Sequence, residues 1–412
     1  MTRHGAPTSS TPDVVIVGGG PAGLSAAIEL RRRGVGSVIV VEREQQAGGA
    51  PRHTDHLGFG LRDLRRITTG PRYAEHLVRT AERLGVEVRT GVTVTTLEGT
   101  LDTTLDRTTV GLATPTGPEQ LAAASVVLAT GVRERPRSAR LVPGDRPAGV
   151  FTTGQVQQFA SLHHEPVGKV AVVVGAEHVS FSALLTLAHV GCTVAAMVTP
   201  VSRHQSHPAL VAATARRYRV PVRTGVDIAE IVGRSRVEAV VLTDGRRIEC
   251  DTVVFTGDWI PEHELARRAG VPMLQAAHAP LVDASLHTAQ PGVFAIGNLV
   301  HPAETADVCA LDGRAVAIGV LDWLTVQQWP DDVLPIEVHA PVLWATHHAL
   351  GITARVSDVV HGQLRLTHAG EVQWISQHRT WLPNRPVTIR RDAMRSAAMP
   401  FANHHLRLDL LQ

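Results

Sequence analysis

The chain has 412 residues, enough for two or three domains, and its 40 Lys and Arg residues nearly balance its 38 Asp and Glu residues. This balance leaves no basic excess that would attract nucleic acid. Residues 1–12 are polar and predict a flexible N-terminus without an apolar signal core, and no stretch reaches the ~18 uncharged apolar residues of a membrane span. We therefore expect a cytoplasmic protein, and its three cysteines give no sign of a disulfide framework.

The first predicted element is a strand, a glycine turn and a helix near the start of the chain. Residues 14–17 are apolar and predict a buried strand, and residues 24–33 predict the helix. Between them, Gly18 permits a tight turn, Gly20 lets the backbone approach a pyrophosphate, and Gly23 lets the helix pack closely on the sheet. This fingerprint predicts that the N-terminus of the helix binds the phosphates of a dinucleotide.

A second strand, residues 38–41, ends in Glu42, whose carboxylate can accept both adenosine ribose hydroxyls of FAD or NAD. Strand, turn, helix and acid are in register, which argues against a glycine-rich turn without a ligand. We expect further contacts with the same nucleotide from other residues of this region, namely Pro21, Ala22, Arg43, Gly49 and Val94.

Two later strands, residues 126–128 and 293–296, each run into a short polar loop. The residues from 304 onward then predict a helix, whose N-terminus could stabilise negative charge on a cofactor. We expect the cofactor to be contacted from both places, by Ala129, Thr130, Gly131, Gly297, Asn298, Thr305 and Ala306.

The same succession of strand, glycine turn, helix, strand, meander and strand recurs in the middle of the chain. The repeated elements are predicted at residues 170–175, 180–190, 193–198, 237–242 and 252–257. The sequence therefore contains two copies of one nucleotide-binding unit.

The turn of the second copy departs from the first. Glu177 takes the place of the glycine that allows close approach of a phosphate, and Ser180 replaces the third glycine. Thr199 stands where the first copy has its ribose acid. Binding of NAD(P) by this copy stays open, because Arg203 and His204 could still meet the 2′-phosphate of NADP.

With these markers in this order, the chain resembles the pyridine nucleotide-disulfide oxidoreductase superfamily. The resemblance implies an α/β fold of two Rossmann-like dinucleotide-binding domains, the second inserted in the first, with FAD as the cofactor. In such proteins the later strand ends in Gly-Asp and the acid binds the ribityl chain, whereas Asn298 offers an uncharged amide. We expect an FAD-binding domain at residues 13–150 and 259–330, and an NAD(P)-binding-like domain at residues 166–258.

Residues 331–412 predict a small β-rich C-terminal domain. Its segments alternate apolar and polar residues, as half-buried strands do, at residues 352–356, 362–366, 372–375, 386–389 and 406–410. His347-His348 and His404-His405 do not predict a metal site, because neighbouring residues on a strand point to opposite faces.

The cysteine pair for which the superfamily is named is missing. By register with the disulfide reductases, Pro51 and His56 stand where the two cysteines would be. Cys192 and Cys250 fall on strands and Cys309 falls in the helix expected beside the flavin, where packing is the favoured role. We therefore expect an FAD-dependent dehydrogenase without a redox-active disulfide.

Arg52, His53 and His56 occupy the place of the dithiol, which the resemblance puts beside the flavin ring. The arginine could hold a substrate carboxylate or phosphate through paired hydrogen bonds, and a histidine could take a proton during catalysis. Equally, Arg52 could bind the FAD pyrophosphate while the histidines hold the loop.

Strings that begin at Gly49, Thr130 and Gly297 resemble bacterial FAD-containing subunits related to opine, hydroxyproline and hydrogen cyanide-forming amino-acid dehydrogenases. They are also similar to flavoproteins that accompany glycerol-3-phosphate dehydrogenase-like subunits. The likeness covers about residues 13–330. It implies a hetero-oligomer, in which this chain passes electrons through FAD and a partner flavin subunit binds a small amine, amino acid or hydroxy acid. Many relatives hold an iron-sulfur cluster in a cysteine-rich C-terminal extension, whereas residues 331–412 contain no cysteine.

Three other functions stay open at this point. The chain could be a self-sufficient FAD dehydrogenase that binds its small-molecule substrate in the Arg52-His53 region. It could be a non-catalytic electron-transfer or docking subunit, or an NAD(P)H-dependent flavin reductase.

Overall fold

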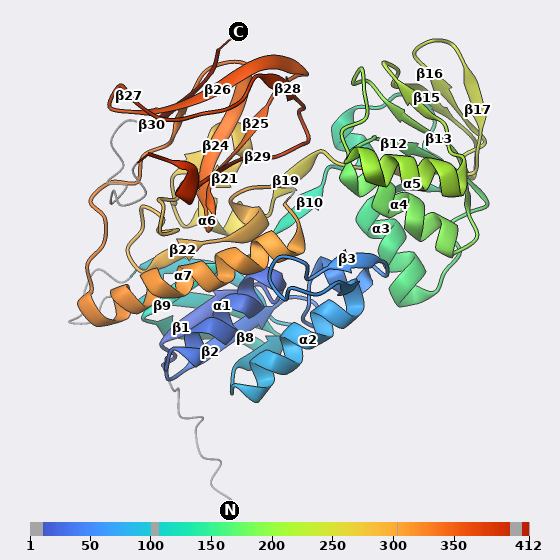
Figure 1. Ribbon diagram of the computed structural model, residues 1–412. Helices are drawn as coiled ribbons and strands as arrows, with labels where there is room; N and C mark the ends of the chain where they lie inside the picture. Colours follow the sequence, from blue (N-terminus) through green and yellow to red (C-terminus); the bar gives the residue numbers. More distant parts are fainter. Residues whose placement is uncertain (1–10, 100–106, 303, 396–405, 412) are drawn as a thin grey trace, which may run out of the picture.

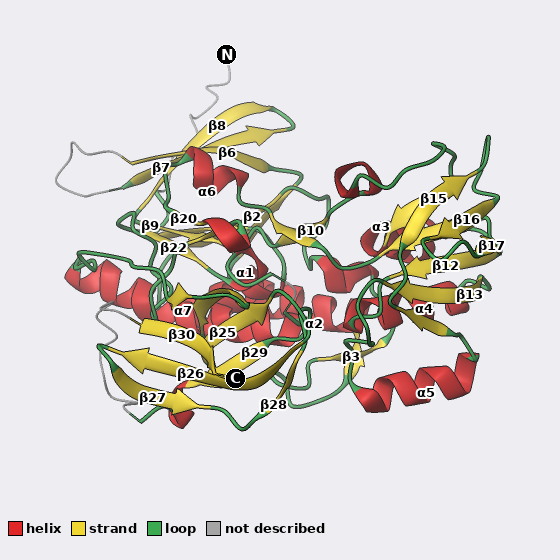
Figure 2. Ribbon diagram, turned by 90° about the horizontal axis from the view of Figure 1, so that it is seen from above, coloured by secondary structure: helices red, strands yellow, loops and turns green. Residues whose placement is uncertain are grey.

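The computed structural model describes residues 11–99, 107–302, 304–395 and 406–411 (Figure 1). The polar N-terminus up to residue 10 and the His404-His405 pair lie outside these residues. The chain forms two α/β parts and a β-rich C-terminal part, as the resemblance implies (Figures 1 and 2). The domain boundaries given above stay predictions.

The first sheet has five parallel strands in the order β22-β9-β1-β2-β5. Its central strands are apolar runs that are buried throughout, which is typical of a parallel sheet covered on both faces. Helices α1 and α7 pack so closely that a Cβ on Gly313 would lie 2.1 Å from the Ala22 carbonyl oxygen. The elements of this part are β1 (Val14–Val17), α1 (Pro21–Arg32), β2 (Val38–Glu42), α2 (Gly70–Arg83), β5 (Glu87–Thr90), β9 (Ser125–Leu128), β22 (Val293–Ala295) and α7 (Ala306–Val326).

Two antiparallel units accompany the first sheet. The predicted meander is present as β6 (Thr93–Gly99), β7 (Thr108–Thr114) and β8 (Gly117–Ala123). A two-stranded ribbon, β3 (Leu57–Phe59) and β4 (Thr68–Thr69), leads from the turn η1 (Ala50–His53) into α2. The sequence analysis did not predict α2 or this ribbon.

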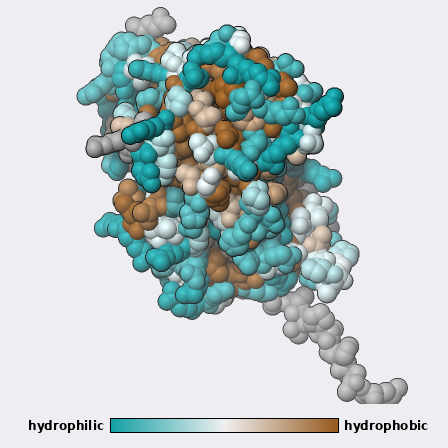
Figure 3. Space-filling model, turned by 90° about the vertical axis from the view of Figure 1, so that its right-hand side faces the viewer, coloured by the Kyte–Doolittle hydropathy of each residue, from teal (hydrophilic) through white to brown (hydrophobic). Residues whose placement is uncertain are grey.

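Four strands of the second sheet repeat the order of β9, β1, β2 and β5 in the first, which confirms the internal repeat. Its strands run β11-β18-β12-β13-β14 and are all parallel. The elements are β11 (Val150–Thr152), α3 (Thr153–Gln158), β12 (Val170–Val174), α4 (His178–His189), β13 (Thr193–Thr199), α5 (Pro208–Tyr218), β14 (Val222–Thr224) and β18 (Thr252–Phe255), with the meander β15 (Ile228–Val232), β16 (Ala239–Leu242) and β17 (Arg247–Glu249). Seen from the side in Figure 3, the surface is mostly hydrophilic, with hydrophobic residues reaching it in patches.

The second sheet is inserted in the first. Two short antiparallel strands, β10 (Val132–Glu134) and β19 (Trp259–Pro261), carry the chain out and back. The chain then forms α6 (Glu264–Arg268) and a ribbon of β20 (Met273–Leu274) and β21 (Ala279–Pro280), and β22 joins the edge of the first sheet. None of the helices that the structure describes is long and apolar enough to cross a membrane.

The C-terminal part consists of two sheets around a common apolar core. All five predicted strands are present, and the turn at Ala369-Gly370 joins two of them. Three strands of this part, β23, β24 and β28, were not predicted from the sequence; of these, β24 is almost wholly buried, so it lacks the alternation of a half-buried strand. The strands are β23 (Glu337–Val338), β24 (Val342–His348), β25 (Gly351–Val356), β26 (Val360–His368), β27 (Glu371–Ile375), β28 (Arg379–Trp381), β29 (Val387–Arg390) and β30 (Leu406–Leu411).

Candidate functional site

The first glycine turn leaves an opening at the carboxyl end of β1. Gly18 has φ +111°, and a Cβ there would lie 2.3 Å from the Ala129 carbonyl oxygen. A Cβ on Gly23 would lie 2.0 Å from the Gly18 carbonyl oxygen. A Cβ on Gly20 would meet only Gly49 Cα among the described residues, at 3.9 Å, so the space beside this glycine is open. A pyrophosphate could therefore approach the backbone closely at Gly20.

Helix α1 starts directly behind this opening. Gly20 is its N-cap and Pro21 its first residue, and no side chain of the described residues caps the helix or adds an acid to its first turn. Because the first N–H groups of a helix lack partners within it, they are free to bind an anion. Ala22 is buried where α1 meets Gly297.

Glu42 closes the adenosine side of the opening. Its Oε2 accepts a hydrogen bond from the Gly19 N–H at 2.8 Å, and its Oε1 accepts one from the Glu44 N–H at 2.9 Å. The carboxylate thus lies beside the turn, where the ribose is expected. Arg43 Nη2 lies 3.5 Å from a carboxylate oxygen of Glu262, and its contact with the nucleotide stays a prediction.

Asn298 uses both halves of its amide to hold the loop between β22 and α7. Its Oδ1 accepts from the Glu304 N–H at 2.8 Å and its Nδ2 donates to the Glu304 carbonyl oxygen at 3.0 Å. An aspartate could not make the second bond, which gives a physical reason for Asn where the superfamily has Asp. The neighbouring Gly297 has φ +67° and donates its N–H to Asp312.

The start of α7 differs from the expectation for a helix that stabilises an anion. Thr305 is the N-cap and Ala306 the first residue, but Asp307 already lies in the first turn. Its carboxylate accepts hydrogen bonds from the Thr305 hydroxyl, the Val308 N–H and the Arg62 N–H. This acid offsets much of the positive end of the helix dipole.

The loop after β9 is fixed by the returning chain. The Thr130 hydroxyl donates to the Glu262 carbonyl oxygen at 2.8 Å, and the Glu262 N–H donates to the Gly131 carbonyl oxygen at 2.9 Å. Gly131 has φ +75°, and a Cβ there would meet no atom of the described residues within 4 Å, so its outer face is open. Val94, on β6, instead packs against the apolar core.

The basic run does not form a single cluster. Arg52 pairs with Glu44 and donates to Gln46 Oε1 at 3.2 Å. His53 is buried; this burial, followed by the charge of Arg52, lowers its pKa to about 4. His53 Nδ1 has no hydrogen-bond partner among the described residues.

His56 belongs instead to a bridge between the two nucleotide-binding units. Its Nε2 lies 2.6 Å from the Ser182 hydroxyl on α4. Gln157 donates to the same hydroxyl at 2.9 Å and accepts from the Thr54 hydroxyl at 3.0 Å. These bonds hold the loop after η1 against α3 and α4.

The second turn is filled by its own side chain. Glu177 is only 6% exposed, and its Oε2 accepts from the Ala176 N–H at 2.9 Å. Its Oε1 accepts from the Thr256 hydroxyl at 2.5 Å. A Cβ on Gly257 would lie 2.5 Å from this carboxylate, which therefore sits between the carboxyl ends of β12 and β18. In open α/β sheets this crevice is where a nucleotide binds.

Thr256 and Arg140, which were not singled out from the sequence, complete this arrangement together with Ser180. The Ser180 hydroxyl lies 2.7 Å from the Thr256 hydroxyl. Arg140 donates to the carbonyl oxygens of Thr256 and Gly257 at 3.1 and 2.7 Å. Its guanidinium brings a positive charge close to the Glu177 carboxylate.

The loop after β13 covers the second turn and is in turn held by the C-terminal part. The Gln205 N–H donates to the Ala176 carbonyl oxygen at 2.8 Å, and the Asn384 N–H donates to Gln205 Oε1 at 2.9 Å. Arg385 donates to His207 Nδ1 at 3.2 Å. Arg203 is exposed on the same loop.

All three cysteines are free and buried. Burial raises the pKa of Cys192 and of Cys250 to about 11, and it raises that of Cys309 well above its usual range. A thiol with a raised pKa carries little thiolate and is a poor nucleophile at neutral pH.

The residues of the first turn fit a bound dinucleotide. The opening beside Gly20, the uncapped start of α1 and the carboxylate of Glu42 offer space, N–H donors and a ribose acceptor. The unpartnered Nδ1 of His53 adds a buried polar atom that a cofactor could satisfy.

Among curated proteins, the chain is similar to one of the subunits of opine oxidase from Rhizobium meliloti, with 25% identity over 338 residues, or 75% of this chain and 62% of that protein. It is 32% identical over 182 residues to the biphenyl dioxygenase system ferredoxin--NAD(+) reductase component of Paraburkholderia xenovorans, which covers 42% of this chain and 43% of that one. The chain therefore spans less than two thirds of the length of either protein.

Thioredoxin reductase from Lactococcus lactis has a similar fold, with a TM-score of 0.64 and 19% identity over 77% of this chain and 100% of that one. The family described as pyridine nucleotide-disulphide oxidoreductase matches residues 12–313. The chain therefore belongs to this family of FAD-dependent oxidoreductases.

Proposed function

We propose that this chain is the cytoplasmic FAD-carrying component of a heteromeric dehydrogenase for a small amine, amino acid or hydroxy acid. Its FAD exchanges electrons with a partner flavin subunit that binds the organic substrate. The observation that carries the proposal is the carboxylate of Glu177, which fills the second nucleotide crevice while the first remains open.

The first unit supplies the binding groups. FAD, when bound, provides the hydride and electron transfer of the reaction. The N–H groups at the start of α1 would hold its pyrophosphate, and Glu42 would accept the ribose hydroxyls. Asn298 has one amide hydrogen that its bonds to Glu304 do not use, and this hydrogen would be the donor to the ribityl chain.

In an NAD(P)H-dependent reductase, NAD(P)H would have to bind to the second unit and pass its electrons to FAD from there. A nucleotide phosphate at this turn would meet the buried negative charge of Glu177, and it would compete with that carboxylate for the Ala176 N–H. The cysteines are buried with raised pKa values, so a thiol relay lacks a reactive thiolate. Electrons are therefore expected from another protein.

A self-sufficient dehydrogenase fits the geometry less well. Arg52 is already neutralised by Glu44, which weakens it as a clamp for an anionic substrate. His53 has a lowered pKa of about 4, and such a weakly basic group accepts a proton poorly at neutral pH. The relatives add support, since the opine oxidase chain and the dioxygenase reductase are both named as parts of larger systems.

The test is co-expression with a candidate dehydrogenase subunit taken from the genes beside this chain, followed by size exclusion and turnover assays. We expect the two chains to co-elute and the complex to oxidise an amino or hydroxy acid at about 1 s⁻¹ or faster. The isolated chain should be far slower with the same substrates.

Two results would refute the proposal. Turnover of the isolated chain at the rate of the complex, without a co-eluting partner, would make it a self-sufficient dehydrogenase. Fast bleaching of its flavin by NADH would make it a reductase.

A further inference from the structure

A basic and apolar surface lies on the ribbon between β3 and β4 and on the start of α2. Leu57, Leu61 and Ile67 are 67%, 57% and 60% exposed. Four exposed arginines lie among and just beyond them in the sequence. We call this set the arginine-leucine surface, which consists of Leu57, Leu61, Arg62, Arg65, Arg66, Ile67 and Arg72.

The charge of this surface is concentrated and uncompensated. Residues 57–72 contain four arginines and one acid, Asp63, a net charge of 4 − 1 = +3 that exceeds the +2 of the whole chain. Asp63 is buried and accepts a hydrogen bond from the Tyr73 hydroxyl at 2.8 Å. Among the described residues, none of the four arginine side chains has an ion-pair partner. An exposed field of one sign attracts a partner of the opposite sign.

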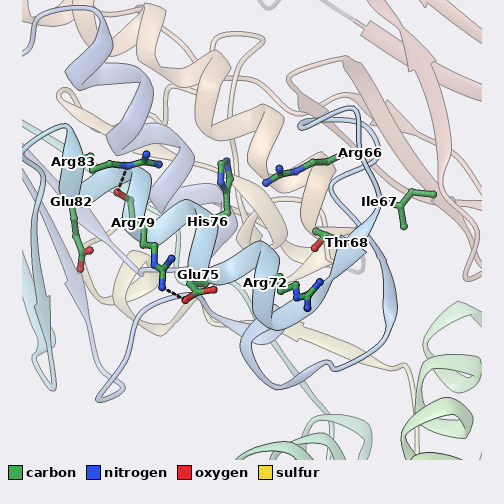
Figure 4. A pocket seen from close by; sticks show the side chains of 9 residues that line it. All are labelled: Arg66, Ile67, Thr68, Arg72, Glu75, His76, Arg79, Glu82 and Arg83. Carbon is green, nitrogen blue, oxygen red and sulfur yellow. Dashed lines mark hydrogen bonds and ion pairs between the residues drawn. The ribbon is translucent and has the colours of Figure 1, made fainter.

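A shallow cavity of about 690 Å³ extends this surface along α2. Figure 4 shows Arg72, Glu75, Arg79 and Arg83 following one another on the helix, with Ile67 on the adjoining strand end. Arg79 is paired with Glu75 at 2.5 Å, whereas Arg83 donates hydrogen bonds to residues of its own helix. Beyond Arg66 and Arg72, the lining adds Arg79 and Arg83 against Glu75 and Glu82, a net charge of 2 − 2 = 0, so the excess positive charge stays on residues 57–72.

The ribbon is held in place from within, although its outer side chains are exposed. The Leu64 and Arg66 N–H groups both donate to the Gly60 carbonyl oxygen, at 3.0 and 3.3 Å. Arg65 has φ +54°, a left-handed conformation that costs a non-glycine residue free energy. An ordered loop that presents exposed apolar groups loses little entropy when it binds.

The surface also lies next to the start of α7, where the cofactor is expected. It follows η1 directly in the chain, and the Arg62 N–H donates to Asp307 in the first turn of α7 at 3.1 Å. Resting on the proposed function, we infer that the arginine-leucine surface is the docking site for the electron-exchanging partner protein, which presents an acidic face with an apolar centre. Apolar contacts at the centre and charges at the rim are the usual anatomy of such interfaces.

The experiment reverses the charge of the surface in the FAD-loaded full chain, as Arg62→Glu/Arg66→Glu/Arg72→Glu. Its control is Arg234→Glu/Arg268→Glu, which reverses two exposed arginines elsewhere. The flavin is reduced photochemically, and its reoxidation is followed by stopped flow with cytochrome b5, an acidic protein, with cytochrome c, a basic one, and with benzoquinone.

We expect the triple variant to slow reoxidation by cytochrome b5 about tenfold at low salt. The control variant should match the wild type, and benzoquinone should react equally with all three proteins. An equal rate with cytochrome b5 for wild type and triple variant would overturn the inference. So would binding of the wild type to vesicles of phosphatidylserine and phosphatidylcholine, since that would assign the surface to a membrane.

A parallel arm separates this inference from the proposed function. The candidate dehydrogenase subunit is co-expressed with wild type, triple variant and control. Co-elution with all except the triple variant supports both proposals, whereas co-elution with all three overturns only the surface. If the wild type captures no partner, the proposed function fails, and the cytochrome rates alone then decide whether the surface docks an acidic protein.

Discussion

The two glycine turns of the chain begin with the same geometry and diverge at three matched positions. Gly18 and Gly175 both have a left-handed φ, and each leaves no room for a side chain beside the neighbouring strand end. In the first turn the three positions hold Gly20, Gly23 and Ala129; in the second they hold Glu177, Ser180 and Thr256.

In the second turn the three residues are bonded to one another, through the Thr256 hydroxyl. Under the proposed function, the difference teaches that loss of a nucleotide site need not loosen a fold. The Glu177 carboxylate occupies the place of a phosphate at the Ala176 N–H and accepts from the Thr256 hydroxyl, which the Ser180 hydroxyl contacts in turn. The fold of the second unit is then kept without a ligand.

The largest effect is expected at the open turn. Gly20→Val should abolish FAD binding, because the branched side chain fits the protein but occupies the path of the pyrophosphate. The ratio of flavin to protein absorbance measures this directly. Gly99→Val on β6, where a Cβ meets only Gln290 Nε2 of the described residues, at 3.7 Å, should keep full flavin content. Retention of FAD by Gly20→Val would show that the first turn is not the phosphate site.

The second prediction concerns the C-terminal part, which touches both units. Arg355 on β25 lies 3.5 Å from Glu304, and their side chains are 6% and 7% exposed. Arg355→Met leaves a buried carboxylate without its charge partner, and we expect a loss of about 3–5 kcal/mol in unfolding free energy. Because the backbone of Glu304 holds Asn298, FAD affinity should fall as well.

Urea unfolding and flavin titration measure the two effects of Arg355→Met. Arg390→Met, which breaks an exposed pair with Asp392, should leave the unfolding free energy unchanged. Equal effects of the two variants would mean that the C-terminal part does not support the loop between β22 and α7, which holds Asn298.

The third prediction is a loss of stability in acid. Burial is the first cause that lowers the pKa of His53, His347 and His348 to about 4 from 6.5. Between these values the unfolded chain binds more protons, so stability is full above pH ~6.5 and falls as the pH drops toward ~4. Each histidine should contribute about 1 kcal/mol per pH unit in this window.

Urea unfolding at several pH values checks the acid prediction, and His53→Asn should flatten the slope. Glu134, whose pKa burial raises to about 7, acts in the opposite sense, since its contribution is lost as the pH rises from 4.5 to about 7. Stability that is constant from pH 6.5 to 4 in both wild type and Glu134→Gln would contradict the assignment.

The smallest effect is expected at Asn298. Asn298→Asp restores the residue typical of the superfamily, yet it removes the donor to the Glu304 carbonyl oxygen and places a negative charge beside it. We expect FAD to bind more weakly by ~1 kcal/mol, measured by flavin titration. Asn298→Ala should be weaker still, and tighter binding by the Asp variant would refute this account of the loop.

Much of the fold could be predicted because its signals are local. Apolar runs, the Gly18 turn and the repeat at Gly175 lie within short stretches, and four strands have the same order in both copies. The sequence also showed that Glu177 replaces the glycine at which a phosphate would approach the backbone. What could not be predicted is the bond from Glu177 to Thr256, since parallel pairing of β12 with β18 joins residues 79 apart.

The candidate site shows the same limit. Arg52, His53 and His56 are neighbours in sequence, but a short turn directs them to Glu44, to the core and to Ser182. The use of the Asn298 amide also depends on a loop geometry that no residue pattern encodes.

Equilibrium binding of NADH and NADPH, followed by fluorescence in the wild type and in Glu177→Gly/Thr256→Ala, tests the central claim most directly. The account predicts no saturation of the wild type up to about 1 mM, and binding at least about tenfold tighter by the double variant, because the carboxylate leaves the crevice. Micromolar binding by the wild type that the double variant does not improve would contradict the account.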